Sequence, residues 1–557
     1  MLPAMKTVMD AIATAAGRGG TVTVAGIGSR PDTSLPWARL HDRAHRLATT
    51  LAAHHIGPGS RVGLLGDTSI GLITAMQAIW LRGAAFTVLP VPGLTGRRTH
   101  LAHLRAVTAD AAFDLVIVDD DLTWLADELR PAVAVRSLQT LTATPALPGE
   151  VVHPGPNALA VLQYTSGSTS TPRGVPVTHG NLAANLDAIE AALGRDSLDP
   201  ATACWLSWLP LYHDMGLIGF LALPMSRGCP LVLQSPITFA MRPASWLERL
   251  SRHRATSTGA PNFAFGLMAQ LLEGETGTDL SSVRLLFSGG EPIDAPTMSR
   301  FADAAARHGL DPGAVVGAYG LAESTLAVTF AQIGRGVTVD EVDRETLERD
   351  GVALPACTGR ATRRLVRLGN AVPGTSLRIV DPGTGQSVPA RTVGEVEVSG
   401  RSVVSGYWGE PRRTGGWLRT GDLGYFADGE LVICGRVKDV LFAAGRNVYP
   451  QDVEAVATGV PGVRPGGAAA FAIPADRGDR LVVAVESRNT DIESLRRAVT
   501  VAVAGETGLA PAEVVMVRPG RLPKTSSGKL RRSETRRRYL AGELTDGTSP
   551  SPDRSLR

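Results

Sequence analysis

Between residues 60 and 91, two short apolar runs flank a longer run with helical spacing. The outer runs, "SRVGLLGD" (60–67) and "AAFTVLPV" (84–91), are typical of buried strands, and "SIGLITAMQAIWLRG" (69–83) is typical of a helix. Two strands joined by such a helix usually run parallel. The order predicts an α/β fold with a parallel sheet covered by helices. Arg82 and Gly83 interrupt the apolar stretch, which argues against a membrane span.

The chain is too long for one hydrophobic core. It has 557 residues, whereas single cores stop growing at roughly 250–300 residues. Beyond about residue 369, short alternating strands are divided by Asp-Pro, Gly and Asp-Gly turns, which indicates a small antiparallel, barrel-like β subdomain. About 100 residues of α+β character follow. We therefore expect a large N-terminal domain (1–437), a small mobile C-terminal domain (438–541) and a disordered tail (542–557).

Composition excludes several classes of function. The net charge of +3 is small for this length, so neither nucleic-acid binding nor a membrane surface is indicated. The four cysteines lie far apart without a CxxC pair, which argues against a disulfide framework or a zinc site. The N-terminus resembles a short amphipathic helix and not a signal peptide. We expect a cytoplasmic protein without an integral membrane segment.

A hydroxyl-rich loop follows an apolar strand at "YTSGSTSTPRG" (164–174). Glycine lets backbone amides approach an anion, hydroxyls add donors, and Arg173 supplies charge. The loop therefore favours phosphate binding over the alternative of a plain polar surface loop. It is not a Walker A loop, and "PKTSSGKL" (523–530) fails that pattern as well.

Three further motifs accompany this loop in order: "YGLAES" (319–324), "WLRTGDLG" with "GRVKD" (417–439), and "LPKTSSGKLRR" (522–532). Together they resemble the adenylate-forming superfamily, which includes acyl-CoA synthetases and peptide-synthetase adenylation domains. "SWLPLYHDMGLIG" (207–219), "SGGEPI" (288–293) and "GRNVYPQDVE" (445–454) resemble its fatty acyl-AMP ligase branch. A family-specific insertion is expected near residues 335–356.

The resemblance implies a reaction in two steps. A fatty acid and ATP, with Mg²⁺, give an acyl-adenylate and pyrophosphate, and the acyl group then passes to the phosphopantetheine arm of an acyl carrier protein. Two alternatives stay open: an acyl-CoA synthetase that uses free CoA, and a degenerate, non-catalytic binding protein. Glu323, Asp422, Lys438 and Lys529 are all present, which counts against the last.

The same resemblance assigns roles to particular residues. Lys529 would bridge the acyl carboxylate and the α-phosphate, His213 would lie beside the carboxylate, and Lys438 would be the hinge between the domains. Glu323 and Thr165 would bind the metal. Tyr319 would stack on adenine, while Asp422 and Arg436 would bind the ribose. The remaining nucleotide-binding residues would be Ser166, Gly167, Ser168, Thr169 and Arg173 around the phosphates, and Ser288, Gly289, Gly290, Glu291, Ala318, Gly320 and Leu321 around the purine.

Some features depart from the family pattern or stay open. Ser170 and Arg173 stand where the family loop usually has glycine and lysine, and serine takes a positive φ less readily, by about 1 kcal/mol. Phe263 and Met225 could line an acyl tunnel or simply belong to the core. The basic run 529–540 has two readings as well, a solvated helix face or a docking surface for an acidic carrier protein.

Overall fold

The computed structural model describes residues 7–28, 30–91, 97–130, 132–144, 152–165, 172–274, 277–443, 446–474, 480–489, 491–524 and 529–544. Most of the hydroxyl-rich loop (166–171), including Ser166, Gly167, Ser168 and Thr169, lies outside these residues. So does most of the predicted tail, from residue 545 onward. No helix within the described ranges is long and apolar enough to cross a membrane.

The first of two large sheets contains the strand–helix–strand unit on which the sequence prediction rests. Its six strands, in spatial order, are β6 (Val135–Ser137), β5 (Leu115–Val118), β3 (Arg61–Leu65), β4 (Ala85–Leu89), β7 (Leu159–Thr165) and β8 (Arg173–Thr178). β3 and β4 run parallel on either side of α3 (Ile70–Leu81), as predicted. Only β8 is antiparallel to its neighbour, β7.

The second sheet is nine-stranded and mostly parallel. Its spatial order is β17 (Asn370–Ala371), β14 (Ala327–Phe330), β13 (Val315–Gly320), β12 (Leu285–Ser288), β11 (Ser257–Ala260), β9 (Trp205–Ser207), β10 (Leu231–Leu233), β1 (Thr21–Val24) and β2 (Thr33–Pro36). One hydrophobic core joins both sheets. Helix α3 is apolar on all its faces and contacts strands of both sheets, so it is buried nearly all round.

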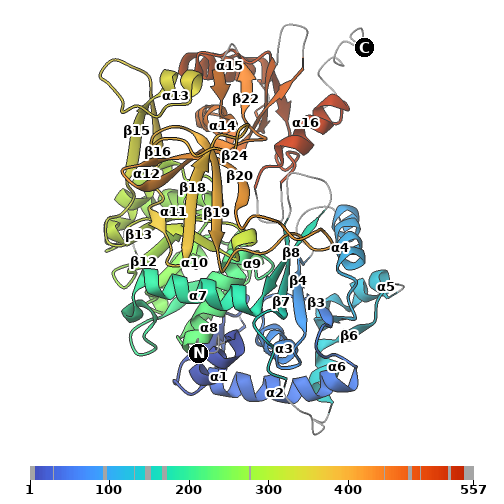
Figure 1. The fold of residues 1–557 in the computed structure, drawn as a ribbon. Coiled ribbons are helices and arrows are strands. Elements are labelled where there is room, and N and C mark those ends of the chain that lie inside the picture. Colours follow the sequence, from blue (N-terminus) through green and yellow to red (C-terminus); the bar gives the residue numbers. More distant parts are fainter. Residues whose placement is uncertain are drawn as a thin grey trace.

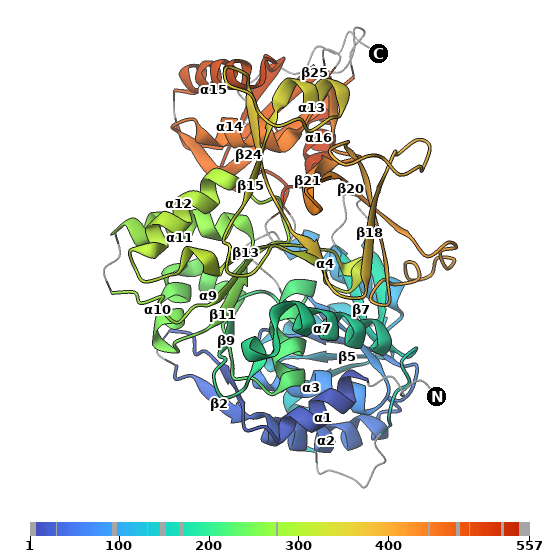
Figure 2. The same ribbon diagram turned by 60° about the vertical axis from the view of Figure 1, so that its left-hand side comes forward.

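Helices cover these sheets from both sides (Figures 1 and 2). They are α1 (Val8–Ala16), α2 (Trp37–Ala53), α4 (Arg97–Ala111), α5 (Ala126–Leu129), α6 (Leu138–Ala143), α7 (His179–Leu193), α8 (Leu223–Arg227), α9 (Pro236–Met241), α10 (Ala244–Arg252), α11 (Asn262–Gly274) and α12 (Ala295–Ala306), with the short 3-10 or π segments η1 (Asp120–Leu125), η2 (Arg195–Leu198), η3 (Met215–Ala222), η4 (Pro312–Ala314) and η5 (Ala322–Ser324).

The expected antiparallel β subdomain forms a four-stranded sheet. Its strands are β18 (Thr375–Val380), β19 (Gly394–Gly400), β20 (Leu418–Ala427) and β21 (Glu430–Arg436). Register shifts interrupt the pairing of β20 with both neighbours. β21 ends at Arg436, and a short turn at 437–440 leads into the C-terminal region (residues 441–544).

The C-terminal region is α+β, as predicted, and lies above the rest of the molecule in Figure 1. Its strands are β22 (Leu441–Ala443), β23 (Arg446–Val448), β24 (Val463–Ile473), β25 (Arg480–Ser487) and β26 (Glu513–Val517), and its helices are α14 (Pro450–Gly459), α15 (Ile492–Thr507) and α16 (Arg532–Leu540). A separate hydrophobic cluster between residues 441 and 516 packs α14 and α15 against the β24–β25–β26 sheet.

The segment expected as a family insertion lies against the C-terminal region. β15 (Val339–Asp343) and β16 (Thr362–Val366) form a two-stranded sheet, and α13 (Arg344–Asp350) follows β15. In both views α13 lies close to α14 and α15. Arg363 of β16 is buried and pairs with Asp452 of α14 at 2.8 Å, and Glu348 of α13 pairs with Arg446 of β23 at 3.4 Å.

Most arginines of the basic run are held by contacts within the C-terminal region. Arg532 forms a bidentate pair with Glu454 of α14, at 2.7 Å for each contact, and also pairs with Asp439 of the turn at 2.7 Å. Arg536 donates to the Ala472 carbonyl, and Arg537 and Arg538 pair with Glu534. Of the two readings of the run, these contacts favour a solvated helix face over a docking surface for a carrier protein.

Helix α7 begins with a buried histidine. His179 has no exposed side-chain area and packs beside Trp80, and burial lowers its pKa to about 4. Between pH 6.5 and 4 the unfolded chain therefore binds a proton at this position that the folded chain does not. Stability due to His179 falls as the pH drops through this window and levels off below about pH 4.

We predict that His179→Leu flattens the acid side of the stability profile. The loss of unfolding free energy between pH 6.5 and 4 should shrink by an amount on the order of 3 kcal/mol relative to the parent. Urea titrations at several pH values measure this difference. The exposed His153→Gln variant is the control, and an unchanged slope in His179→Leu would contradict the prediction.

Candidate functional site

Two predicted phosphate-site residues lie together where β7 ends and β8 begins. Thr165 ends β7 and lies opposite Arg173, the first residue of β8, in the strand register. The loop between them lies outside the described residues. The described residues on either side of this loop therefore lie next to each other at one edge of the sheet.

Glu323 approaches this edge from the second sheet. It lies on η5, and one of its carboxylate oxygens accepts a hydrogen bond from the Tyr407 hydroxyl at 2.6 Å. The Arg173 guanidinium lies 3.7 Å from the Tyr407 ring centroid and pairs with Glu410 at 2.7 Å. The hydrogen bond that Arg173 donates to Glu410, with the nearby charge of Glu323, raises the pKa of Arg173.

The backbone that presents Glu323 is sharply bent. A Cβ on Gly320 would lie 2.1 Å from the Leu326 carbonyl oxygen, so this position accepts only glycine. Thr325 has φ 70° and ψ −58°, and the Leu326 N–H donates to the Ser324 carbonyl at 2.9 Å. These values define a strained γ-turn. The buried Thr325 hydroxyl donates to the Ser402 carbonyl at 2.6 Å, which holds the turn in place.

A second group of predicted residues meets where β13 faces the four-stranded sheet. The Tyr319 hydroxyl donates to one oxygen of Asp422 at 2.7 Å, and Arg436 donates to the other at 2.6 Å. Asp422 and Arg436 are opposite residues of β20 and β21. Burial and the Asp422 charge raise the pKa of Tyr319, while the Asp422 charge raises that of Arg436. The buried carboxylate of Asp422 thus holds the adenine candidate Tyr319 and the second ribose candidate Arg436 together.

The predicted purine-binding segments lie at adjacent strand ends. β12 ends at Ser288 and pairs in parallel with β13. A Cβ on Gly289 would lie 2.9 Å from the Ala318 carbonyl oxygen, so the 288–291 and 318–321 segments are in close contact. The buried Ser288 hydroxyl has no hydrogen-bond partner within the described residues. A polar group left in this state at a strand end is suited to a ligand.

Lys529 reaches this region from the C-terminal region. Burial would raise the pKa of Asp214, but the charges of His213 and Lys529 lower it. Burial raises the pKa of Glu291, and the Phe263 N–H and the Lys529 charge oppose that shift. His213 pairs with Asp214 at 2.6 Å. The charge of Lys529 therefore acts on a carboxylate of the His213 segment and on one of the "SGGEPI" segment, whereas Lys438 is exposed in the 437–440 turn.

The residues around Glu323 suit a magnesium ion that also binds phosphate oxygens. The described part of the chain holds no group of three or more His, Cys, Asp or Glu side chains that could bind a metal by themselves. Tyr407 occupies one oxygen of Glu323 and leaves the other, and Thr165 ends the neighbouring strand. Mg²⁺ often takes only one or two carboxylates beside substrate phosphates.

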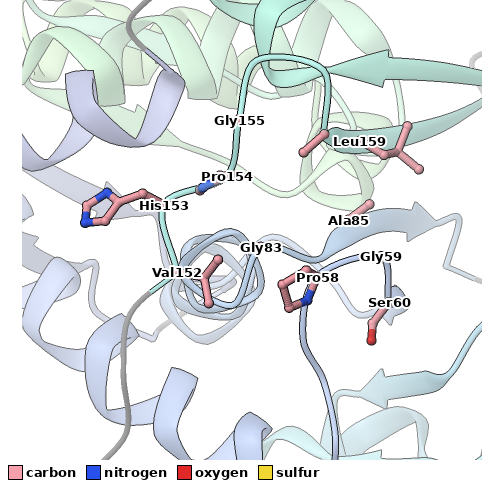
Figure 3. Close-up of a pocket in the computed structure, with 11 residues that line it drawn as sticks. Pro58, Gly59, Ser60, Gly83, Ala85, Val152, His153, Pro154, Gly155 and Leu159 are labelled. Carbon is pink, nitrogen blue, oxygen red and sulfur yellow. The ribbon is translucent and has the colours of Figure 1, made fainter.

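A cavity of about 260 Å³ lies elsewhere (Figure 3). Ser60 and Ala85, which line it, lie at the amino ends of β3 and β4, whereas Thr165 lies at a carboxyl end. Ligands of open parallel sheets bind beyond the carboxyl ends. This cavity, lined mainly by small and apolar side chains around His153, is therefore not the candidate active site.

Sequence reasoning missed several supporting residues. Tyr407 and Glu410 lie in "YWGEP" (407–411), which matches none of the motifs. Asp214 lies beside His213 and was not predicted as a site residue. Of the two candidates for an acyl tunnel, Met225 is buried and its sulfur accepts from Gln77, so it belongs to the core. Phe263 is 39% exposed and packs edge-on against Trp208 and Phe239.

Comparison with known proteins agrees with this arrangement. The model of the AMP-binding enzyme family matches residues 13–408. A putative acyl-CoA synthetase of Caulobacter vibrioides is 38% identical, over 92% of this chain and 91% of the relative. A long-chain-fatty-acid–AMP ligase of Mycobacterium marinum, FadD26, is 35% identical, over 91% of each chain.

Solved structures give the same result. A structure from a study of fatty acyl-adenylate ligases of E. coli and L. pneumophila superposes with a TM-score of 0.89 at 33% identity, covering 96% of this chain and 98% of that one. The L. pneumophila ligase in complex with acyl adenylate and pyrophosphate gives 0.72 at 28% identity, covering 96% of both. The chain belongs to the AMP-binding enzyme family, in the branch that contains the fatty acyl-AMP ligases.

Proposed function

We propose that this protein activates a fatty acid with ATP, releasing pyrophosphate, and transfers the acyl group from the adenylate to the phosphopantetheine thiol of an acyl carrier protein. The observation that carries the proposal is the position of Lys529. Its charge acts on Asp214 and Glu291, which belong to two segments of the large N-terminal part. A cation at that point can neutralise the carboxylate and the α-phosphate as they approach each other.

The other residues then have defined tasks. Arg173, with Thr165 and the loop hydroxyls Ser166, Ser168 and Thr169, holds the β- and γ-phosphates, which leave as pyrophosphate. Gly167 lets the loop backbone approach them. Glu323 and Thr165 hold Mg²⁺, which when bound neutralises phosphate charge. The family resemblance and the placement of Thr165, Arg173 and Glu323 at one edge support these tasks.

On the nucleoside side, Tyr319 stacks on the adenine while its hydroxyl stays on Asp422. Each oxygen of Asp422 keeps a lone pair beside its present partner, so the carboxylate can still accept from the ribose. Arg436 reaches the same sugar. Ser288, Gly289, Gly290 and Glu291 line one side of the purine, with Ala318, Gly320 and Leu321 on the other, and His213 lies beside the acyl carboxylate.

The proposed domains divide at Lys438. Residues 1–437 bind ATP and the acyl chain, and residues 438–541 carry the catalytic lysine and rotate about the turn between β21 and β22. The separate hydrophobic clusters on either side of the turn and the exposure of Lys438 support this division. A cytoplasmic location suits an enzyme that consumes ATP and whose cysteines are all free.

We predict that Lys529→Ala lowers the rate of acyl-adenylate formation by at least about 100-fold. ATP affinity should stay within about threefold, because the nucleotide contacts come from other segments. Pyrophosphate release measures the rate, and equilibrium titration measures the affinity. Arg537→Ala is the control, since Arg537 is exposed and pairs with Glu534 within α16. Adenylation at the parent rate in Lys529→Ala would refute the assignment.

The acyl acceptor is tested separately. With acyl-adenylate formed in place, transfer to a phosphopantetheinylated carrier protein should exceed transfer to free CoA by at least about tenfold, as the resemblance to the fatty acyl-AMP ligases implies. A thioester assay with each acceptor gives the ratio. Efficient transfer to free CoA would instead establish an acyl-CoA synthetase, the activity named for the Caulobacter relative.

A further inference from the structure

Two parts of the phosphate site meet on the side chain of Tyr407. Its hydroxyl donates to Glu323 at 2.6 Å, and its ring carries the Arg173 guanidinium at 3.7 Å. Glu323 follows a strand of the nine-stranded sheet, whereas Arg173 begins a strand of the six-stranded sheet. Tyr407 belongs to neither sheet, because it lies in the segment between β19 and β20.

The segment around Tyr407 is fixed to both sheets. The Val404 N–H donates to the Glu323 carbonyl at 2.9 Å, and the Trp408 N–H donates to the Gly174 carbonyl at 2.8 Å. A Cβ on Gly174 would lie 3.0 Å from that of Trp408, so the two backbones are in close contact. Tyr407 lies between these two attachments, and its position is set by the backbone on either side.

The contacts of Tyr407 also have a defined direction. A phenol carries one O–H donor and an ionised carboxylate only accepts, so the Tyr407 hydroxyl donates to Glu323. Arg173 is half-exposed, and among the described residues it pairs with Glu410 besides stacking on the ring. A planar guanidinium stacks on an aromatic face, whereas an ammonium is a compact, strongly hydrated charge. An arginine at position 173 can thus stack on the Tyr407 ring, which a lysine there would do less well.

We infer that Tyr407 is a positioning residue, which fixes the Glu323 carboxylate and the Arg173 guanidinium relative to each other so that one MgATP is held by both. The inference rests on the proposed function, since it assigns Glu323 to the metal and Arg173 to the β- and γ-phosphates. Hydrogen-bond partners of ligating carboxylates typically change metal affinity or activity by about 10- to 100-fold when they are removed.

Tyr407→Phe separates the contact with Glu323 from the contact with Arg173. It removes the hydrogen bond to Glu323 and keeps the ring under Arg173. We expect Mn²⁺, titrated calorimetrically into the protein with α,β-methylene-ATP, to bind at least about tenfold more weakly. Affinity for the same analogue without metal should stay within about twofold. Tyr407→Leu removes both contacts and should weaken both affinities.

The control is a second tyrosine–glutamate pair. Tyr539 of α16 donates to Glu513 at 2.5 Å within the C-terminal region, so Tyr539→Phe should leave Mn²⁺ affinity unchanged. Thermal unfolding of all variants checks that they are folded. Parent-like Mn²⁺ affinity in folded Tyr407→Phe would overturn the inference. If the parent binds neither nucleotide nor metal, the proposed function itself fails.

The energetic coupling between Arg173 and Tyr407 in nucleotide binding tests the inference independently. Arg173→Lys should weaken binding of the metal-free analogue at least about threefold in the parent, because lysine loses the stacked contact. In the Tyr407→Leu background the same substitution should have no further effect. Equal losses in both backgrounds would show that Arg173 acts without Tyr407 and would overturn this part of the inference.

Discussion

A strained backbone turn underlies the candidate site. The γ-turn at Thr325 folds the chain back after β13, which carries the Glu323 carboxylate toward the edge where the phosphate loop begins. Such conformations cost about 1–3 kcal/mol and persist only where the surroundings enforce them. Gly320 and the bond from Thr325 to Ser402 do so here. Because Ser402 and Tyr407 belong to one segment, the same stretch of chain enforces the turn and orients the carboxylate that it presents.

The proposed reaction also needs a cation that comes from outside the large N-terminal part. Lys529 is brought to Asp214 and Glu291 by a C-terminal region that also contacts the β15–β16 sheet and α13. Arg363 and Glu348, one from each ion pair of this contact, are both buried. Removing one partner of such a pair costs more than the pair contributes, since a charge is left buried. The buried ion pair therefore adds little to the stability of the fold. Its main effect is to favour one orientation of the C-terminal region.

The elements and motif residues were predictable where they depend on local pattern. The β3–α3–β4 unit, the antiparallel sheet and the α+β C-terminal region follow from apolar periodicity and turn residues, and the motifs identified Glu323, Asp422 and Lys529. The support for these residues was not predictable. Tyr407 is 84 positions from Glu323, and nothing in "YWGEP" indicates its partner. A positive φ at threonine contradicts residue preference, and only tertiary contacts reveal it. For Met225 the sequence left tunnel and core open, and its packing assigns it to the core.

Arg532 adds a mechanical consequence. It joins Asp439, next to the proposed pivot, to Glu454 of α14, and it stands three residues after Lys529. The pivot, the first helix of the C-terminal region and the end of the lysine loop are therefore clamped to one guanidinium. In the rotation proposed at residue 438, these three parts would move together, because one guanidinium holds them.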